Sequence, residues 1–160
     1  MLKISKLADY ATLVLQRLSL SAKESCSAAD LAEQSNIAYP TVCKVLKQLA
    51  EAGLVQSQRG VRGGYSMTQS AQSVTLYDIV TAIDGEIALT ECSSLAGDCV
   101  HSDYCDLSQN WQLVSRLLVT VLKAVTLTEM AQSFDMAQLL QSVQLQALPS
   151  SNQGSEEHHG

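Results

Sequence analysis

The sequence predicts a mainly α-helical fold with one β-hairpin, followed by a cysteine-bearing loop and a long helix. Apolar residues recur at helical spacing through most of the 160 residues. A glycine-rich turn separates two short strand-like segments between residues 54 and 68. Three cysteines gather between residues 92 and 105. With 46% apolar residues, the chain has enough hydrophobic content for one compact core and is not a disordered sequence.

Three helices are expected in the first half of the chain. Apolar residues repeat at spacings of three and four over residues 5–20, which predicts a helix with one buried face. Ser27 is a good N-cap for a short second helix over residues 28–34. Pro40 suits the first position of a third helix, because its missing N–H costs nothing there. Gly53 should end that helix.

A hairpin should follow, with strands over residues 54–58 and 64–68. Glycines between the strands permit a tight turn that can approach another molecule closely, and Arg59 and Arg62 lie at its tip. Helix, helix, turn, helix and a basic-tipped hairpin is the order of a winged helix-turn-helix. We therefore expect a winged helix-turn-helix DNA-binding domain, whose third helix fits a major groove.

Charge is divided unevenly along the chain. Residues 1–70 carry a net charge of +3 and residues 71–160 one of −9, giving −6 overall. A basic half on an acidic chain can still meet phosphate, so Lys44 and Lys47 are expected to contact the DNA backbone, with the wing arginines in a narrow minor groove. An ordinary solvated helix face is the alternative for the two lysines. For the outward-facing Cys43, a DNA contact and a tolerated surface thiol are equally open.

The second half is expected to supply a dimer seam. A helix over residues 74–83, with Ser73 or Thr75 as its cap, should lead into the cysteine loop. After the loop, apolar residues alternate steps of four and three over nearly three heptads, which indicates a dimerisation helix or, alternatively, the core helix of a monomer. A last helix is expected over residues 135–148, followed by a disordered tail from Pro149. The seam comprises Leu107, Trp111, Val114, Leu118, Val121 and Val125.

The cysteine loop predicts a metal site. Cys92, Cys99 and Cys105 lack the paired C-x-x-C knuckles of a zinc ribbon. Residues 91–107 contain four acidic residues and no Lys or Arg, and acidic surroundings oppose thiolate formation. A bound cation or iron cluster would reverse that penalty. The pattern favours metal ligation over a bare thiol switch, and three inert loop cysteines are the remaining alternative.

Other functional classes find little support. The sequence holds no Ser/His/Asp set, no phosphate-binding glycine loop and no paired-carboxylate motif, so we expect neither an enzyme nor a small-molecule substrate. Its longest apolar stretches fall far short of the about 18 residues that a membrane helix needs, so no membrane partner is expected. Charged residues interrupt any signal-peptide core, which predicts a cytoplasmic protein whose cysteines form no disulfide framework.

Taken together, the motifs resemble the Rrf2 family of bacterial transcription regulators over about residues 1–130. Within that family the chain is most similar to the regulators of SUF-type iron–sulfur assembly in proteobacteria. The resemblance implies a homodimer that binds a double-stranded DNA operator, senses iron–sulfur cluster status or redox state, and controls iron–sulfur assembly genes. A thiol-redox or zinc-stabilised repressor without a cluster is the alternative. The motifs are Leu2–Lys6 with Tyr10–Ala11, Gly53–Val55, Arg59–Gly60, Gly63–Tyr65 and the three-cysteine loop.

The resemblance also implies the ligands of a two-iron or four-iron cluster. It assigns three ligands to Cys92, Cys99 and Cys105. Some members complete the site with an aspartate from the first helix of the partner subunit, a position that Asp9 occupies here. Carboxylate is a workable ligand for iron, so Asp9 is preferred to the other candidates. These are His101, Asp106 and Ser108, the last standing where some members have a histidine.

The family's DNA contacts carry over to the third helix and the wing. Its base-reading stretch corresponds to Pro40, Thr41 and Cys43, and its wing arginine to Arg59. The complete set expected to contact DNA is Tyr39, Pro40, Thr41, Cys43, Lys44, Lys47, Arg59 and Arg62. The expected organisation is a DNA-binding domain over 1–70, a helix, cluster loop and dimerisation helix over 71–130, a C-terminal helix over 131–148 and a tail over 149–160.

Overall fold

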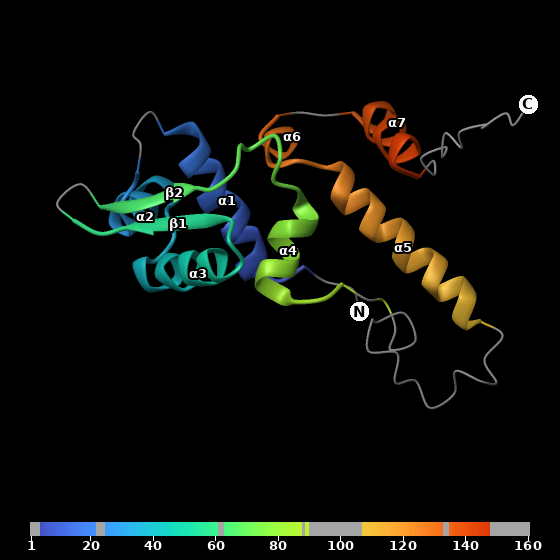
Figure 1. Ribbon diagram of the computed structural model, residues 1–160, viewed down its shortest axis with the longest axis horizontal. Coiled ribbons are helices and arrows are strands. Elements are labelled where there is room, and N and C mark those ends of the chain that lie inside the picture. The colour runs from blue at the N-terminus through green and yellow to red at the C-terminus, as the bar shows by residue number, and fades with distance from the viewer. Residues whose placement is uncertain are drawn as a thin grey trace, which may run out of the picture.

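The computed structural model describes residues 4–21, 25–60, 63–87, 89, 107–132 and 135–147. A lobe of three helices and a hairpin lies at one end, and a long helix extends from the other end (Figure 1). The mainly helical fold with one antiparallel hairpin confirms the predicted fold class. The elements are α1 (Lys6–Leu20), α2 (Ala28–Ser35), α3 (Tyr39–Glu51), β1 (Val55–Gln58), β2 (Gly64–Met67), α4 (Leu76–Asp84), α5 (Ser108–Ala124), α6 (Leu127–Met130) and α7 (Met136–Ala147).

Side-chain caps set the starts of the first two helices. The Ser5 hydroxyl accepts the Ala8 N–H at 3.1 Å, so Ser5 is the N-cap of α1 and not its first residue. Ser27 and Asp30 form a reciprocal capping box at α2, which confirms Ser27 as the predicted N-cap. The third helix begins at Tyr39, one residue before the predicted Pro40, and its start has no side-chain cap.

The core lies between α1 and the helices around it. Helix α1 packs against α2 and α3 in the first lobe, and it also contacts α4 and α6. Fully burying one leucine or valine contributes about 1.5–3 kcal/mol, so this shared apolar cluster provides most of the gain that opposes chain entropy. The largest fully buried side chains include Leu15, Leu31, Leu46, Leu49, Ile79 and Leu127.

A buried cysteine fastens the hairpin to the helices. Val55 pairs with Met67 and Gln58 with Gly64 across the two strands. On the other edge of β2, the Cys26 N–H donates to the Tyr65 carbonyl at 2.9 Å, and the Tyr65 N–H returns a bond to the Cys26 carbonyl at 2.8 Å. Cys26 is therefore a buried structural residue that adds a one-residue bridge to the sheet.

A second bridge joins the starts of α4 and α6. The Leu76 N–H donates to the Val125 carbonyl at 2.9 Å, and the Leu127 N–H donates to the Val74 carbonyl at 2.8 Å. Both helices begin with a capping box, and the bridge between Thr75 and Thr126 brings their N-termini side by side. The C-terminal end of α5 is thereby anchored to the lobe. The two boxes are Thr75 with Asp78 and Thr126 with Glu129.

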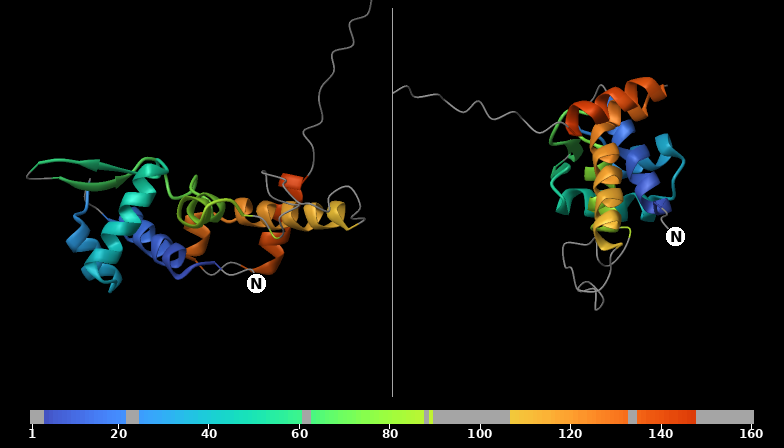
Figure 2. Two further views of the ribbon diagram at one scale, coloured as in Figure 1. Left: turned by 90° about the horizontal axis from the view of Figure 1, so that it is seen from below. Right: turned by 90° about the vertical axis from the view of Figure 1, so that its right-hand side faces the viewer.

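The predicted seam on α5 divides into two unequal parts. Near the anchored end Val125 is only 4% exposed, because it packs within its own chain. Towards the other end Trp111 is 44% exposed, and Leu107 and Val114 are exposed as well. The prediction of one continuous dimer seam is therefore corrected, because Val125, its last residue, is buried within its own chain. Figure 2 shows the N-terminal half of α5 projecting away from the hairpin lobe.

The last helix packs on α5. It spans Met136–Ala147, inside the predicted 135–148. Its Leu139 and Val143 are half-buried, whereas Leu140 and Leu145 are exposed. Nowhere in the part of the chain that the structure describes is a helix both long and apolar enough to span a membrane.

Candidate nucleic-acid interface and cysteine segment

The third helix divides its residues between the core and solvent as a DNA-reading helix requires. Val42, Val45, Leu46 and Leu49 are buried against α1 and α2, so the opposite side of α3 faces outward. On that outward side, Pro40, Lys44 and Lys47 are exposed, and Thr41 and Cys43 are half-buried. The predicted set therefore gathers on one surface.

A pair of interacting side chains lies at the start of this surface. Tyr39 is exposed, and its phenol shares a hydrogen bond with the Cys43 thiol one helical turn further on. This hydrogen bond is the main cause that raises the pKa of Tyr39 above 10.0. The phenol proton is therefore engaged with the Cys43 sulfur, and the phenol oxygen remains free to accept a hydrogen bond from a donor on a base edge.

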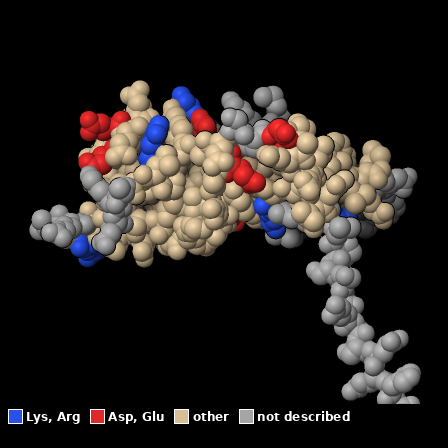
Figure 3. Space-filling view, turned by 90° about the horizontal axis from the view of Figure 1, so that it is seen from above, with Lys and Arg blue, Asp and Glu red and all other residues tan. Residues whose placement is uncertain are grey.

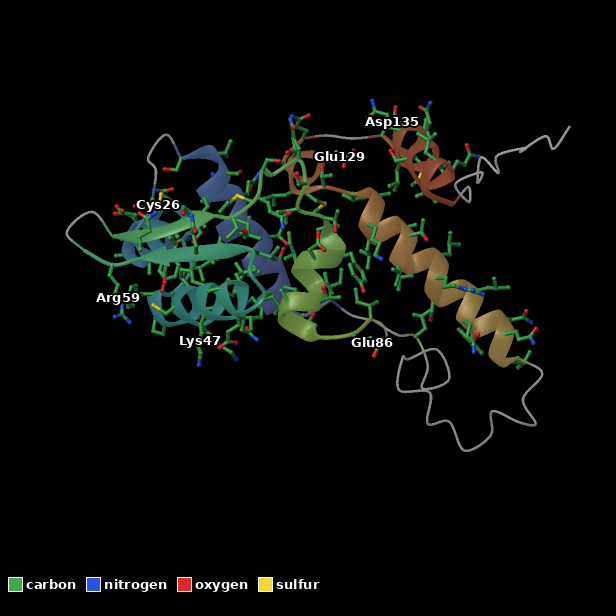
Figure 4. The ribbon with its side chains drawn as sticks, in the orientation of Figure 1. Cys26, Lys47, Arg59, Glu86, Glu129 and Asp135 are labelled. Atoms are coloured by element: carbon green, nitrogen blue, oxygen red, sulfur yellow. The ribbon has the colours of Figure 1, made fainter. Side chains whose placement is uncertain are left out.

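Basic side chains follow the same edge of the molecule. Figure 4 shows Lys47 and Arg59 pointing outward, the first from α3 and the second from the end of β1. Lys47 Nζ lies 3.8 Å from Glu51 Oε1, but the two side chains are 77% and 65% exposed, so the pair is weak and open to exchange for phosphate. Arg62 lies outside the described residues. On the face drawn in Figure 3, basic and acidic groups are interspersed and form no continuous field of one sign.

Asp9 borders an open groove between α1, α4 and α6. The groove has a volume of about 490 Å³, with an apolar wall from α4 and α6. Asp9 is exposed at its α1 side. Asp84, at the end of α4, accepts the Ser5 N–H at 3.0 Å and holds the start of α1 beside α4. The groove is lined by Ile4, Ser5, Lys6, Asp9, Thr12, Leu76, Val80 and Met130.

The predicted ligands Cys92, Cys99 and Cys105 lie outside the described residues, as do His101, Asp106 and the Ser108 side chain. Their donor chemistry, three thiols among carboxylates with no basic residue, suits a cationic metal group. Within the described ranges, no group of three or more His, Cys, Asp or Glu residues could hold a metal ion. Cys26 and Cys43 there are free thiols.

The described flanks attach the cysteine segment to α5. Ser115, only 6% exposed, accepts the Leu89 N–H on its hydroxyl at 3.2 Å. Leu89 precedes Cys92 by three residues, and α5 begins three residues after Cys105. Both ends of the segment therefore meet the N-terminal half of α5, so a change inside the segment acts first on that helix.

The sequence model of the Rrf2 family, described as an iron-dependent transcriptional regulator, matches residues 4–133. The chain belongs to the Rrf2 family. Its curated relatives include HTH-type transcriptional regulators named IscR. The protein from Vibrio vulnificus (strain YJ016) is 28% identical over 130 residues, covering 81% of this chain and 77% of its own. That from Vibrio campbellii is 25% identical over 139 residues, covering 86% and 82%.

Solved Rrf2-type structures share the fold. CymR, the global cysteine regulator of B. subtilis, superposes with a TM-score of 0.64 at 25% identity, over 84% of this chain and all of CymR. IscR of T. potens gives a TM-score of 0.61 at 22% identity, over 85% of this chain and 95% of its own. Family membership, the winged-helix fold and a role in DNA-binding transcription regulation, not enzymatic catalysis, are thus confirmed.

Three features of the site were not predicted from the sequence. The Tyr39–Cys43 pair could have been predicted from the sequence, because residues four apart meet on one face of a helix. The groove beside Asp9 and the buried Ser115 depend on how distant helices pack, and no local pattern marks them.

Proposed function

We propose that the chain is a homodimeric transcription regulator that senses iron–sulfur cluster status or redox state and controls iron–sulfur assembly genes. The proposal rests chiefly on one observation: the outward side of α3 and Arg59 at the end of β1 carry the described members of the set expected to contact DNA. It extends the family description of an iron-dependent regulator to this chain. Such a regulator acts in the bacterial cytoplasm, where its operator lies.

On DNA, α3 enters the major groove. Tyr39, Pro40, Thr41 and Cys43 approach base edges from its first turns, and Lys44 and Lys47 reach phosphates on its flank. Arg59 and Arg62 on the wing enter the adjacent minor groove. Two copies related by a two-fold axis then present two α3 helices at a spacing of about 34 Å, one turn of DNA.

In the sensing half, Cys92, Cys99 and Cys105 hold the iron–sulfur cluster, and Asp9 of the partner subunit supplies a fourth ligand. When bound, the cluster would supply an oxygen-sensitive inorganic group whose presence depends on the supply of iron. Ser115 fixes the Leu89 side of the cysteine segment on α5, and Asp84 fixes the start of α1 that carries Asp9. The shared site thus ties α5 of one subunit to α1 of the other. Releasing this link changes the spacing of the two α3 helices. The coupling free energy between the cluster site and DNA binding is expected to be about 1–3 kcal/mol.

Dimerisation follows from the N-terminal half of α5. Trp111 and Val114 are exposed on a helix segment that projects from the lobe, and Leu117 adds a further exposed apolar side chain. Exposed apolar surface of this kind marks an interaction site. Helix-turn-helix regulators commonly bind as two-fold dimers, which makes a second copy the natural partner.

Anaerobic reconstitution with ferrous iron and sulfide tests the ligands. Single Cys92→Ala, Cys99→Ala and Cys105→Ala variants should lose visible cluster absorbance, whereas Cys43→Ser should retain it, because Cys43 lies on α3. Full absorbance in all three loop variants would show that the ligand assignment is wrong. Asp9→Ala should give a cluster that decays faster than in Glu33→Ala, which also loses one exposed helix carboxylate. Equal decay would remove Asp9 from the ligand set.

A cluster-free alternative uses the same DNA edge. In that case the chain is a thiol-redox or zinc-stabilised repressor, and its structural neighbour CymR is described as a global cysteine regulator. Metal analysis together with visible spectra of anaerobically purified protein separates the two. Iron and sulfide in stoichiometric amounts support the cluster, and zinc alone or no metal supports the alternative.

A further inference from the structure

The first half of α3, residues 39–45, carries no forked side chain that can read a base through two paired hydrogen bonds. In the major groove, Arg or Lys reads guanine, Asn or Gln reads adenine, and Asp or Glu reads cytosine. Of these six types the segment contains only Lys44, whose ammonium is a flexible point charge. Further along α3, the Oε1 atom of Gln48 is buried, so this amide cannot present both of its polar atoms to a base edge. Hydrogen-bonding forks therefore do not set the sequence preference of this half of α3.

The side chains that this half of α3 turns outward are largely apolar. The Tyr39 ring is 55% exposed, and the exposed Pro40 beside it has no N–H to donate. Thr41 contributes a methyl group. The half-buried Cys43 contributes a soft sulfur that behaves as a small apolar group. Contacts of this kind read the C5-methyl group of thymine, the one apolar group that a base pair presents in the major groove.

The hydrogen bond between Tyr39 and Cys43 decides which polar atom this surface leaves for DNA. The phenol proton is engaged with the sulfur, so the phenol oxygen is left as an acceptor. An acceptor beside apolar groups is complementary to an A·T pair, which offers the adenine amino donor and the thymine methyl group in the major groove. A G·C pair offers the cytosine amino donor but no methyl group. The methyl group is therefore what distinguishes the two pairs for this surface.

We propose that the outward surface of residues 39–43 selects A·T pairs in the operator by packing against thymine methyl groups. The inference rests on the proposed DNA binding and names the base chemistry that α3 recognises. Lys44 and Lys47 then supply affinity through phosphates, which carry no sequence information. Burying one methyl group on this surface raises affinity about fourfold.

The test replaces single thymines by deoxyuridine, which removes the methyl group and keeps every hydrogen-bonding group of the base. The probe is the duplex that the full-length, anaerobically purified protein selects from a randomised library. Each replacement at a position that α3 contacts should weaken wild-type binding about fourfold in anisotropy titrations. Cys43→Ser exchanges the sulfur for a polar hydroxyl, so it should bind the thymine and uracil duplexes equally at one such position or more.

Lys47→Ala is the matched control, because it removes a 77% exposed side chain expected to contact phosphate. It should weaken the thymine and uracil duplexes equally and keep the ratio between them. A wild type that selects no sequence from the library overturns the proposed operator binding itself. Equal wild-type affinity for the two duplexes overturns only the methyl readout, and this comparison stands even if Cys43→Ser disturbs folding. A folded Cys43→Ser protein that keeps the full thymine preference at every position overturns the assignment to this surface.

Discussion

Removing the wing arginine should change how DNA binding responds to salt. Each phosphate contact made by Lys or Arg releases condensed counterions, so log K falls with log salt by about 0.9 per contact. The described residues offer three exposed basic groups on the DNA edge of each protomer, Lys44, Lys47 and Arg59. A dimer therefore has six, and the expected slope is about −5.4.

Arg59→Ala removes two of these six contacts from the dimer. The slope should become about −3.6, which reduces the affinity loss between 50 and 200 mM salt from about 1,800-fold to about 150-fold. With an unchanged intercept at 1 M salt, affinity at 0.1 M should fall about 60-fold. Participation of Arg62 would steepen both slopes and leave the difference between them unchanged.

Fluorescence anisotropy with an operator duplex at four or more salt concentrations measures these slopes. Lys123→Ala is the matched control, because it removes one positive charge that lies 4.5 Å above the Tyr77 ring, on helices outside the DNA edge. It should leave the slope near −5.4. If Arg59→Ala also keeps the wild-type slope, the wing does not contact the phosphate backbone, and the predicted DNA edge shrinks to α3.

Three further substitutions test other parts of the structure. Gly64→Ala should destabilise the fold by about 1–3 kcal/mol in urea unfolding, because its Cβ would lie 2.6 Å from the Cys26 carbonyl oxygen. Leu127→Ala should cost about 2–5 kcal/mol in the same assay, since this side chain is fully buried in the shared core. Glu51→Gln should tighten DNA binding about 1.5- to 5-fold in anisotropy titrations, because it frees Lys47 from its exposed partner.

Local chemistry in the sequence was enough to predict the helices of the DNA-binding lobe. Ser27 caps α2 as expected, and Gly53 follows α3 with a φ of 74°, a left-handed conformation that glycine adopts without strain. Thr75, one of two predicted caps, is the residue that starts α4. Each of these residues acts through hydrogen bonds or backbone conformation within one helical turn. Their effect therefore depends little on tertiary packing.

Long-range pairing could not be predicted in the same way. The bridge between Thr75 and Thr126 joins residues far apart in the sequence, and the short helix α6 that it supports was not predicted. The cysteine spacing indicates a metal site, but whether Asp9 completes it depends on a second subunit. The heptad spacing on α5 shows which residues form its apolar face. It does not show whether the same chain or a second molecule buries each of them.

The divided seam has a consequence for how a signal can reach DNA. At one end of α5, Val125 and the bridge to α4 hold the helix against the lobe that carries α3. Near the middle of α5, Ser115 holds the flank of the cysteine segment. Since the Thr75–Thr126 bridge fixes one end of α5, we expect a displacement at Ser115 to tilt the helix about that bridge. Because α1 and α4 pack against each other and against α3, a rotation of α5 in the proposed dimer changes the relation between the two DNA-binding lobes more than it deforms either one.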